Sequence, residues 1–495
     1  MIEMNYNPSI YEINSRVWLK KLERDMGILS LGEIPDSYWN SLTEAGMDYV
    51  WLMGVWQTSE SVIKKYCFEN GLVKSYKRAL KDWTEKDVIG SPFAVEEYKI
   101  NSALGDRQSL IKLESALNKK GIKLILDFVP NHFSAESSLL KSNPEIFLSV
   151  NKEYFDNDPH TFYQPFKENQ KYFAHGRDPF FPSWQDTAQV NFFSRQAREY
   201  LTNILLELTA VCDGVRCDMA MLALNNVFQN TWGGVLTKSG FEKPLTEFWK
   251  DAIEETKNKR ADFLFIAEAY WDMEWDLQQL GFDYTYDKKL TDRLKSGNTR
   301  AVYEHLLADK EYQNKSLRFL ENHDEERAVS ALGKEKSKAA AVIISTILGM
   351  RFYYDGQFDG KKIKLPVQLG REPEEAAILG LPEFYNNLLK ISSHEIFKQG
   401  EWKLLNPANS WGTNDTYKNI LTWQWSLQTE NRIVIVNYSD SISTCRVKLD
   451  LLGHQEEFVI KDILNDQTYT RSAEEVYHTG LFIELKPYQS HIFAY

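Results

Sequence analysis

Residues 211–219 read Val-Cys-Asp-Gly-Val-Arg-Cys-Asp-Met, and this stretch decides the fold. A run of mostly small and apolar residues ends in an arginine two residues before an aspartate. Because side chains alternate between the two faces of a strand, Arg216 and Asp218 should point the same way at the end of a strand. The guanidinium would then favour the ionised carboxylate. Taken alone, such a pair is more often a structural ion pair than a nucleophile with its partner, so the surrounding sequence decides.

Seven other β-prone runs accompany this one, and segments with helical spacing lie between many of them. One such helix is predicted from Leu110 to Lys120, where Gly121 ends it. Strands that alternate with helices form a parallel sheet, and eight strands close a (β/α)₈ barrel. A doubly wound α/β sheet is the alternative, but polar residues at the C-terminal ends of many runs favour the barrel. The eight runs are Tyr11–Trp18, Asp48–Met53, Ile122–Val129, Asp213–Asp218, Phe263–Glu268, Phe282–Tyr286, Leu317–Asn322 and Met350–Tyr354.

Two segments depart from this alternation and predict further domains. Residues 133–190 contain no clear strand–helix unit and are rich in Asn, Asp, Pro and aromatic residues. This segment reads as a small domain inserted after the third strand. From residue 400 onward, short β-prone runs alternate with turn residues, which is typical of an antiparallel β-sandwich. We therefore predict a catalytic barrel over 1–132 and 191–399, an inserted domain over 133–190 and a C-terminal sandwich over 400–495.

The composition limits the classes of function. The 495 residues carry a formal net charge of −12, which argues against nucleic acid or an anionic membrane as a partner. No window reaches transmembrane length, and the N-terminus lacks a basic start followed by an apolar run. The four cysteines have no C-x-x-C spacing, so neither a disulfide framework nor a zinc site is predicted. We expect a cytoplasmic enzyme, for which neutral ligands remain open.

Side chains capable of chemistry follow four of the eight runs. In a parallel barrel the C-terminal ends of the strands lie on one face, so these side chains should converge. Each has an ordinary alternative when taken singly, for example a rim position for Glu268 or a turn cap for Asp324. Four carboxylates, two histidines and one arginine on the third, fourth, fifth and seventh strands are more than structural roles explain. They are Asp127, His132, Arg216, Asp218, Glu268, His323 and Asp324.

The segments that carry these residues resemble the motifs of the α-amylase family of retaining glycoside hydrolases and transglycosylases. The resemblance covers the barrel, the inserted domain and the C-terminal sandwich, which is nearly the whole chain. Four of the matching segments lie at strand ends, and a fifth lies near the end of the inserted domain. They are Asp127–His132, Gly214–Asp218, Ala267–Ala269, Glu321–Asp324 and Gln189–Asn191.

The resemblance implies a role for each of these side chains. Asp218 would be the nucleophile, Glu268 the general acid/base and Asp324 the stabiliser of the transition state. Retaining hydrolysis needs one ionised and one protonated carboxyl group roughly 5–5.5 Å apart. Arg216 should hold Asp218 charged, while apolar neighbours at 267 and 269 and aromatic residues at 270 and 271 should favour protonated Glu268. The other residues implied to bind the substrate are Asp127, His132 and His323.

Three departures from the family pattern concern the substrate. Where the family often has Lys-His after the nucleophile, positions 221 and 222 hold Met and Leu, so contacts to the leaving group should differ. Phe93 stands where many members place a tyrosine against the sugar ring, and it would stack on the sugar without a hydroxyl. Arg327 resembles an arginine of enzymes that act on short oligosaccharides. Its alternative role is a surface ion pair with an acid at 325 or 326.

The resemblance requires no cofactor but raises one question about a metal. In the family, the asparagine at the position of Asn131 often binds a structural calcium together with acids of the inserted domain. Three acids are available there, although their spacing is not that of a dense oxygen-ligand site. They are Asp158, Asp178 and Asp186.

The sequence thus predicts a retaining α-glycosidase that acts on α-glucans, chiefly α-1,4-linked malto-oligosaccharides. Transglycosylation at the same site is the nearest alternative, because both reactions pass through a glycosyl-enzyme and differ only in the attacking acceptor. A catalytically inactive, carbohydrate-binding relative is a third interpretation. It is disfavoured because Asp218, Glu268 and Asp324 are all present.

Overall fold

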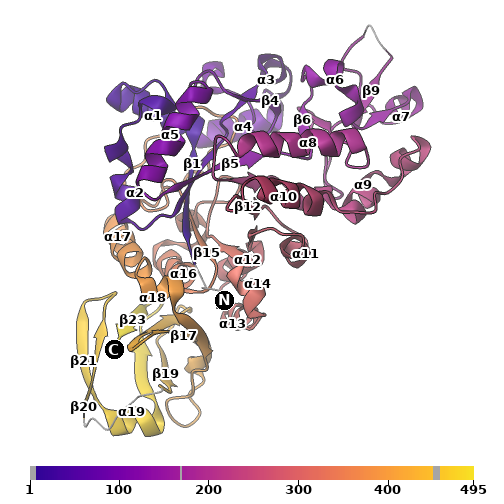
Figure 1. Cartoon of the computed structure of the whole chain (residues 1–495). Helices are drawn as coiled ribbons and strands as arrows, with labels where there is room; N and C mark the ends of the chain where they lie inside the picture. Colours follow the sequence, from indigo (N-terminus) through magenta and orange to yellow (C-terminus); the bar gives the residue numbers. More distant parts are fainter. Residues whose placement is uncertain (1–6, 168–169, 450–456) are drawn as a thin grey trace.

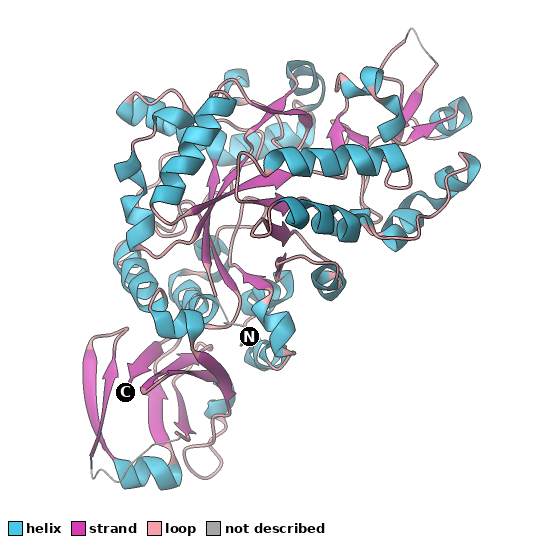
Figure 2. Cartoon of the chain, viewed as in Figure 1, coloured by secondary structure: helices cyan, strands magenta, loops and turns pink. Residues whose placement is uncertain are grey.

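The centre of the molecule is a closed barrel of eight parallel strands (Figures 1 and 2). The computed structural model describes residues 7–167, 170–449 and 457–495. The first and last barrel strands pair in parallel and close the ring, with Ser9 opposite Arg351. The predicted fold class is confirmed. The barrel strands are β1 (Ser9–Asn14), β2 (Tyr49–Met53), β5 (Lys123–Phe128), β11 (Gly214–Cys217), β12 (Leu264–Ala267), β13 (Tyr284–Tyr286), β14 (Ser316–Arg318) and β15 (Met350–Tyr354).

Along each barrel strand, side chains alternate between the interior of the barrel and the layer that packs against the helices. Ile125 packs inside the barrel with residues such as Leu317, whereas its neighbour Leu126 packs in the outer layer between strands and helices. Gly214 begins β11 where the neighbouring strands come very close. A Cβ added there would lie 2.5 Å from the Leu264 carbonyl oxygen and 2.9 Å from the Ile125 side chain. Only glycine fits at this position.

Helices form an outer layer around the strands (Figure 2). The helix predicted from Leu110 begins slightly earlier, because the Asp106 side chain accepts a hydrogen bond from Ser109 N at 2.8 Å and caps it. No helix within the described ranges is long and apolar enough to cross a membrane. The main helices of the barrel are α1 (Ser15–Met26), α5 (Arg107–Lys119), α8 (Arg195–Leu208), α9 (Asn225–Lys238), α10 (Phe248–Lys259), α12 (Lys288–Ser296), α13 (Thr299–Leu306), α16 (Lys334–Thr346) and α17 (Leu381–Ser392).

Two predicted strand boundaries were wrong. The first run was expected to reach Trp18, but α1 begins at Ser15. Trp18, Leu19 and Leu22 are buried on one face of that helix, so helical spacing overrides the β-prone composition. The seventh run ends as a strand at Arg318, and the polar residues that follow form a loop.

A group of short elements lies between β5 and α8 and projects from the barrel at the upper right of Figure 1. β6 and β10 pair antiparallel, and β7, β9 and β8 form a second small sheet. The limits of 133–190 for an inserted domain stay a prediction. The elements are β6 (His132–Ser134), α6 (Leu139–Ser142), β7 (Ser149–Val150), α7 (Lys152–Asn157), β8 (Phe162–Tyr163), β9 (Tyr172–Ala174) and β10 (Thr187–Gln189).

The C-terminal region forms two antiparallel sheets below the barrel in Figure 1. Ile433 from one sheet and Ile483 from the other lie in a common apolar core. On the opposite face, the indoles of Trp423 and Trp425 both donate to the Thr346 carbonyl oxygen, at 2.8 and 2.7 Å, at the end of α16. The strands are β16 (Glu401–Leu405), β17 (Ile420–Leu427), β18 (Glu430–Asn437), β23 (Ser490–Ala494), β20 (Glu457–Asp462) and β21 (Gln467–Ser472) in one sheet, and β19 (Ser443–Val447) and β22 (Leu481–Leu485) in the other.

Candidate active site

One guanidinium gathers three carboxylates at the C-terminal ends of neighbouring strands. Arg216, on β11, donates from Nη1 to Asp218 Oδ1 at 2.8 Å. Its Nη2 lies 2.8 Å from Glu268 Oε2, and its Nη1 lies 3.6 Å from Asp127 Oδ1. All four side chains are buried. We call these four residues the Arg216 cluster. A single cation therefore faces three acids out of contact with bulk water.

Glu268 follows β12 and lies in more polar surroundings than predicted. Its Oε2 accepts a hydrogen bond from Met219 N at 2.7 Å, and its Oε1 accepts one from the Tyr270 hydroxyl at 2.8 Å. Tyr270 is therefore a polar partner rather than an apolar neighbour. Burial nevertheless raises the pKa of Glu268, and Arg216 only partly opposes that shift.

Asp218 and Asp127 also have raised pKa values, because both are buried. Burial raises the pKa of Asp218 against the opposing effect of Arg216. For Asp127, burial raises the pKa to about 7, although Arg216 and a hydrogen bond from Gly54 N at 3.0 Å act in the other direction. The cluster therefore favours the retention of protons near neutral pH.

The backbone turns sharply directly after Asp218. Met219 has φ 42° and ψ 48°, a left-handed conformation that residues other than glycine rarely adopt. This turn aims the Met219 amide at Glu268 and begins the short 3₁₀ helix Ala220–Ala223. Met221 and Leu222 are buried in that helix. Their side chains therefore belong to the apolar core.

His323 lies between two carboxylates. Its Nδ1 is 2.6 Å from Glu12 Oε1, and its Nε2 is 3.0 Å from Asp324 Oδ2. Burial alone would lower the pKa of His323, but Asp324 and Glu12 raise it well above the usual value. Burial likewise acts to raise the pKa of Asp324, and His323 outweighs it, so that the net pKa lies below the usual range. The Asp324 side chain is 48% exposed, so a charged carboxylate faces the open side of the site.

Sequence reasoning missed Glu12, which is fully buried on β1. A signal was present, because Glu12 is an acid in the otherwise mostly uncharged run of that strand. It also shares the barrel-facing side with Ile10, two residues earlier. A buried acid inside a barrel needs a hydrogen-bond or ion-pair partner. Nothing in the sequence indicates that His323, 311 residues away, is that partner.

Phe93 lies at the site, as predicted. Its ring centre is 5.2 Å from that of His323, and the Arg216 guanidinium lies 5.3 Å from the same ring. Trp51 contacts His323 from another side, with ring centres 5.6 Å apart at 79°. Arg216 Nε also donates to Tyr286 Oη at 3.3 Å.

His132 is buried and packs against Trp184, with ring centres 5.3 Å apart. Burial lowers the pKa of His132 to about 4, so it is neutral at pH 7. Its neighbour Asn131 does not fit a calcium ligand as it lies. The Asn131 Oδ1 accepts a hydrogen bond from Gln189 Nε2 at 2.9 Å.

Two of the three acids named for calcium accept hydrogen bonds from nearby backbone amides. Asp178 Oδ1 accepts hydrogen bonds from Phe180 N at 2.7 Å and Phe181 N at 3.0 Å, and Asp158 Oδ1 accepts one from Thr161 N at 3.0 Å. Within the described part of the chain, no three His, Cys, Asp or Glu side chains gather as a metal-binding group. A structural calcium at Asn131 stays a prediction, and no step below depends on a metal.

Arg327 is buried, and its contacts lie within the protein. Its Nη1 lies 2.8 Å from Glu321 Oε1 and donates to the Asp355 carbonyl oxygen at 2.8 Å. The alternative of a surface ion pair with an acid at 325 or 326 was wrong, because the partner is the buried Glu321. A role in substrate binding stays a prediction.

A partly buried aromatic ring, Trp271, follows Glu268 by three residues and contacts an exposed one, Phe180. Trp271 contacts Phe180 of the β9–β10 segment edge-on, with ring centres 4.9 Å apart. Phe180 is 67% exposed, which is unusual for so large an apolar side chain. Trp271 has φ 61°, so its backbone is also in the left-handed region.

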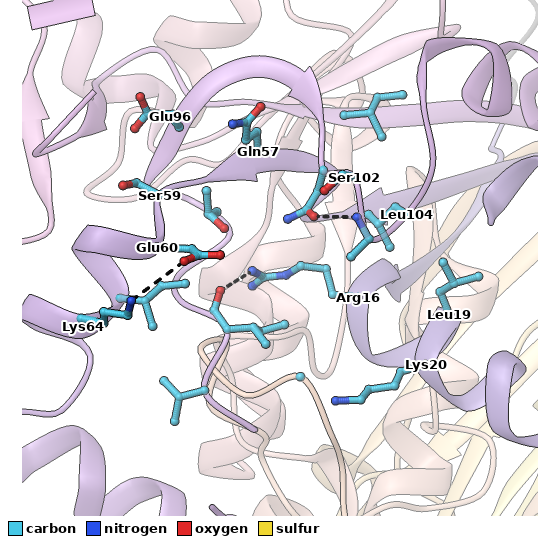
Figure 3. A pocket seen from close by; sticks show the side chains of 18 of the residues that line it. Arg16, Leu19, Lys20, Gln57, Ser59, Glu60, Lys64, Glu96, Ser102 and Leu104 are labelled. Atoms are coloured by element: carbon cyan, nitrogen blue, oxygen red, sulfur yellow. Dashed lines mark hydrogen bonds and ion pairs between the residues drawn. The ribbon is translucent and has the colours of Figure 1, made fainter. Parts of the chain in front are cut away.

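A large cavity lies elsewhere. It has a volume of about 1070 Å³ and is lined by none of the predicted site residues (Figure 3). Arg16 in this cavity donates to the carbonyl oxygens of Ile89 and Gly90 at 3.2 and 2.9 Å, and Glu60 pairs with Lys64. Arg16 and the Glu60–Lys64 pair are thus engaged within the protein. We therefore place the candidate site at the converging carboxylates and not at this cavity.

The sequence pattern that defines the α-amylase catalytic domain matches residues 42–376. The chain belongs to the α-amylase family of glycoside hydrolases. α-Amylase MalA of Haloarcula japonica is 23% identical over 276 residues, which are 54% of this chain and 36% of that protein. α-Amylase 3 of Dictyoglomus thermophilum is 23% identical over 292 residues, which are 56% of this chain and 55% of that protein. The chain thus spans between about a third and three fifths of the length of the curated relatives it matches.

Solved structures of α-amylase-family proteins share the fold over almost the whole chain. The noncanonic maltogenic α-amylase AmyB of Thermotoga neapolitana has a TM-score of 0.68 at 20% identity, and the match covers 99% of both chains. The debranching enzyme of Nostoc punctiforme has a TM-score of 0.63 at 16% identity and is covered over 98% of its length. At these identities, the likeness establishes the fold.

Proposed function

We propose that this α-amylase-family protein is a retaining α-glycosidase that cleaves α-1,4 bonds in malto-oligosaccharides. In this mechanism Asp218 attacks the anomeric carbon and forms a glycosyl-enzyme, while Glu268 protonates the departing oxygen. The observation that carries the proposal is the bridge between these two carboxylates, each 2.8 Å from a different terminal nitrogen of Arg216. A retaining mechanism needs its two carboxyl groups close together, and one guanidinium holds both.

The two carboxylates need different protonation states, and their contacts with Arg216 differ. The Arg216–Asp218 contact has hydrogen-bond geometry, whereas Arg216 Nη2 lies near Glu268 without making a hydrogen bond. Charge-assisted hydrogen bonds favour the ionised acceptor. One cation cannot neutralise three buried acids, so the cluster retains a proton, and we assign that proton to Glu268 as the general acid. That assignment matches a nucleophile at Asp218 and an acid at Glu268.

Asp324 supplies the third carboxylate. It is charged, half-exposed and held by His323, so its oxygens can accept hydrogen bonds from sugar hydroxyls. Such bonds accelerate the reaction when they strengthen as the ring distorts towards the transition state. The names of relatives support the substrate class, since several are α-amylases and one solved structure is described as a maltogenic α-amylase.

The test is the stereochemistry and size of the first products. The purified protein is incubated with maltose to maltoheptaose, isomaltose, trehalose, sucrose and soluble starch, and products are followed by proton NMR and chromatography. We expect malto-oligosaccharides to be cleaved with the α-anomer formed first, before mutarotation. A first-formed β-anomer would overturn the retaining mechanism, and cleavage of isomaltose alone would overturn the linkage.

The same experiment separates the alternatives. Products longer than the substrate would indicate transfer to a sugar acceptor from the same glycosyl-enzyme. No turnover of any substrate, together with measurable binding of maltoheptaose by calorimetry, would indicate an inactive binding protein. The Asp218→Asn variant is the control, because it keeps the shape of the site and should release no product above background.

A further inference from the structure

Each ring nitrogen of His323 lies beside a carboxylate oxygen. A carboxylate oxygen lies within 3.0 Å of each nitrogen, Glu12 Oε1 at Nδ1 and Asp324 Oδ2 at Nε2. A neutral imidazole carries a proton on one nitrogen only and would leave a lone pair facing one of these carboxylates. The imidazolium form places a positive charge against both carboxylates, with a hydrogen bond at Nδ1 and an ion-pair contact without hydrogen-bond geometry at Nε2. The geometry of the Glu12–His323–Asp324 chain therefore points to a charged histidine.

Glu12 is placed to act on His323 and not on a substrate. It is fully buried on β1, below the ring, and its second oxygen, Oε2, has no hydrogen-bond partner among the residues that the structure describes. The ring is 2% exposed and is confined by Trp51 and Phe93. Without a carboxylate at Glu12, an imidazolium in this enclosure would keep only the half-exposed Asp324 as a direct partner.

The other charged groups near the ring act in both directions. Asp127 and Asp218 each have an electrostatic interaction with His323 that favours its charged form. The positive charge of Arg216 opposes it, since this guanidinium lies against the same Trp51 and Phe93 rings. Tyr286 and Tyr354 are neutral phenols that interact with Glu12. The buried Glu12 remains the acid in direct contact with Nδ1.

We propose that Glu12 is a positioning residue that keeps His323 doubly protonated and thereby holds Asp324 directed at the bound sugar. This inference rests on the proposed function, because it assigns a purpose to Asp324 in the glycosidase site. Glu12 itself touches no reacting atom. Its effect passes through one imidazole ring to the carboxylate that meets the substrate.

The test is Glu12→Gln, which keeps the side-chain volume and removes the charge. We expect kcat/KM on maltoheptaose to stay within about threefold of wild type at pH 5 and to fall by about tenfold or more at pH 8. The loss should lie mainly in kcat. Glu12→Asp, which restores a carboxylate, should recover much of the activity at pH 8. Glu274→Gln is the matched control, since Glu274 is also a buried glutamate but follows β12 at the start of α11 (Glu274–Gln279).

A second readout does not depend on turnover. Nitrogen-15 shifts of labelled histidines distinguish imidazolium from neutral imidazole, and His323→Asn identifies the signal. We expect His323 to remain charged to above pH 8 in the wild type and in Glu274→Gln, and to lose its proton below pH 8 in Glu12→Gln. An imidazolium signal that survives to pH 8 in Glu12→Gln would overturn the inference. Absence of wild-type turnover would refute the proposed function and leave the titration to test this contact separately.

Discussion

Two buried arginines of this barrel have different environments. Arg216 faces three carboxylates at the C-terminal ends of the strands, as described above. Arg318 on β14 pairs with Asp287, which also accepts a hydrogen bond from His305 Nε2 at 2.8 Å, and Arg318 Nη2 donates to Gln313. We call Arg318, Asp287, His305 and Gln313 the Arg318 cluster. All four are buried among the elements around α12 and α13.

The two clusters differ in whether all of their buried polar atoms have hydrogen-bond partners. Among the described residues, no buried side-chain nitrogen or oxygen of the Arg318 cluster lacks a hydrogen-bond partner, and one cation meets one carboxylate. In the Arg216 cluster, Asp127 Oδ1 and Arg216 Nη2 lack such a partner. Natural proteins satisfy nearly all buried polar groups, so an unsatisfied cluster calls for an explanation beyond stability. We therefore expect the Arg318 cluster to serve stability and the Arg216 cluster to serve the reaction.

The largest expected effect is on catalysis by the Arg216 cluster. Asp218→Asn should lower kcat by roughly 10⁴-fold or more, because it removes the proposed nucleophile. The midpoint of urea unfolding should stay the same or rise, since one of three acids that share Arg216 is neutralised. Steady-state kinetics and urea unfolding of the full chain check both. A variant that kept wild-type kcat, or one that unfolded at much lower urea, would remove the distinction between the clusters.

The opposite pattern is expected for the Arg318 cluster. Asp287→Asn should lower the free energy of unfolding by about 3–5 kcal/mol, because it leaves Arg318 buried without a counter-charge. The kcat of the folded fraction should remain within about threefold of wild type. Urea unfolding with activity measured well below the midpoint tests this. An unchanged midpoint would mean that the Arg318 cluster contributes nothing to stability.

The smallest effect is a pair of opposite pH slopes in stability. Burial raises the pKa of Asp127 to about 7, so the folded state holds a proton that the unfolded state has lost, and stability falls as pH rises from about 4 to 7. Burial lowers the pKa of His305 to about 4, so the unfolded state binds a proton that the folded state does not, and stability falls as pH drops from about 6.5 to 4. Each slope should be at most about 1.4 kcal/mol per pH unit.

Two variants separate these slopes. Asp127→Asn should remove the loss of stability towards neutral pH, and His305→Gln should remove the loss towards acid. The measurement is the free energy of urea unfolding between pH 4.5 and 7.5. If both variants kept the wild-type profile, neither burial-induced shift would contribute to stability.

Local patterns were sufficient to predict the barrel and most of its strands. Each strand needs only a short β-prone run, and the polar residues at strand ends follow from the shared direction of parallel strands. The helix at Ser15 was missed, because β-prone composition and helical spacing overlap in a short apolar segment. Boundaries depend on caps and packing that composition does not encode.

The contacts between residues of the site were harder to predict than the identity of those residues. Arg216 and Asp218 are two residues apart, so the strand period reveals their contact. Glu12 and His323 meet only because β1 and the loop after β14 come together on closure, and Tyr270 reaches Glu268 through a loop of unpredictable course. The surface acid named as the alternative partner of Arg327 was wrong, because the actual partner, Glu321, is buried six residues before it and is recognised only in the tertiary structure.

The pairing of β1 with β15 determines when the site forms during folding. The first barrel strand finds its parallel partner more than three hundred residues later, and such long-range pairings form slowly. Until β1 pairs with β15, Glu12 does not contact His323, and Asp324 has no charged histidine beside it. During synthesis or refolding, the chain can build most of its helices and strands before the site has any reactive geometry. Recovery of activity therefore reports barrel closure.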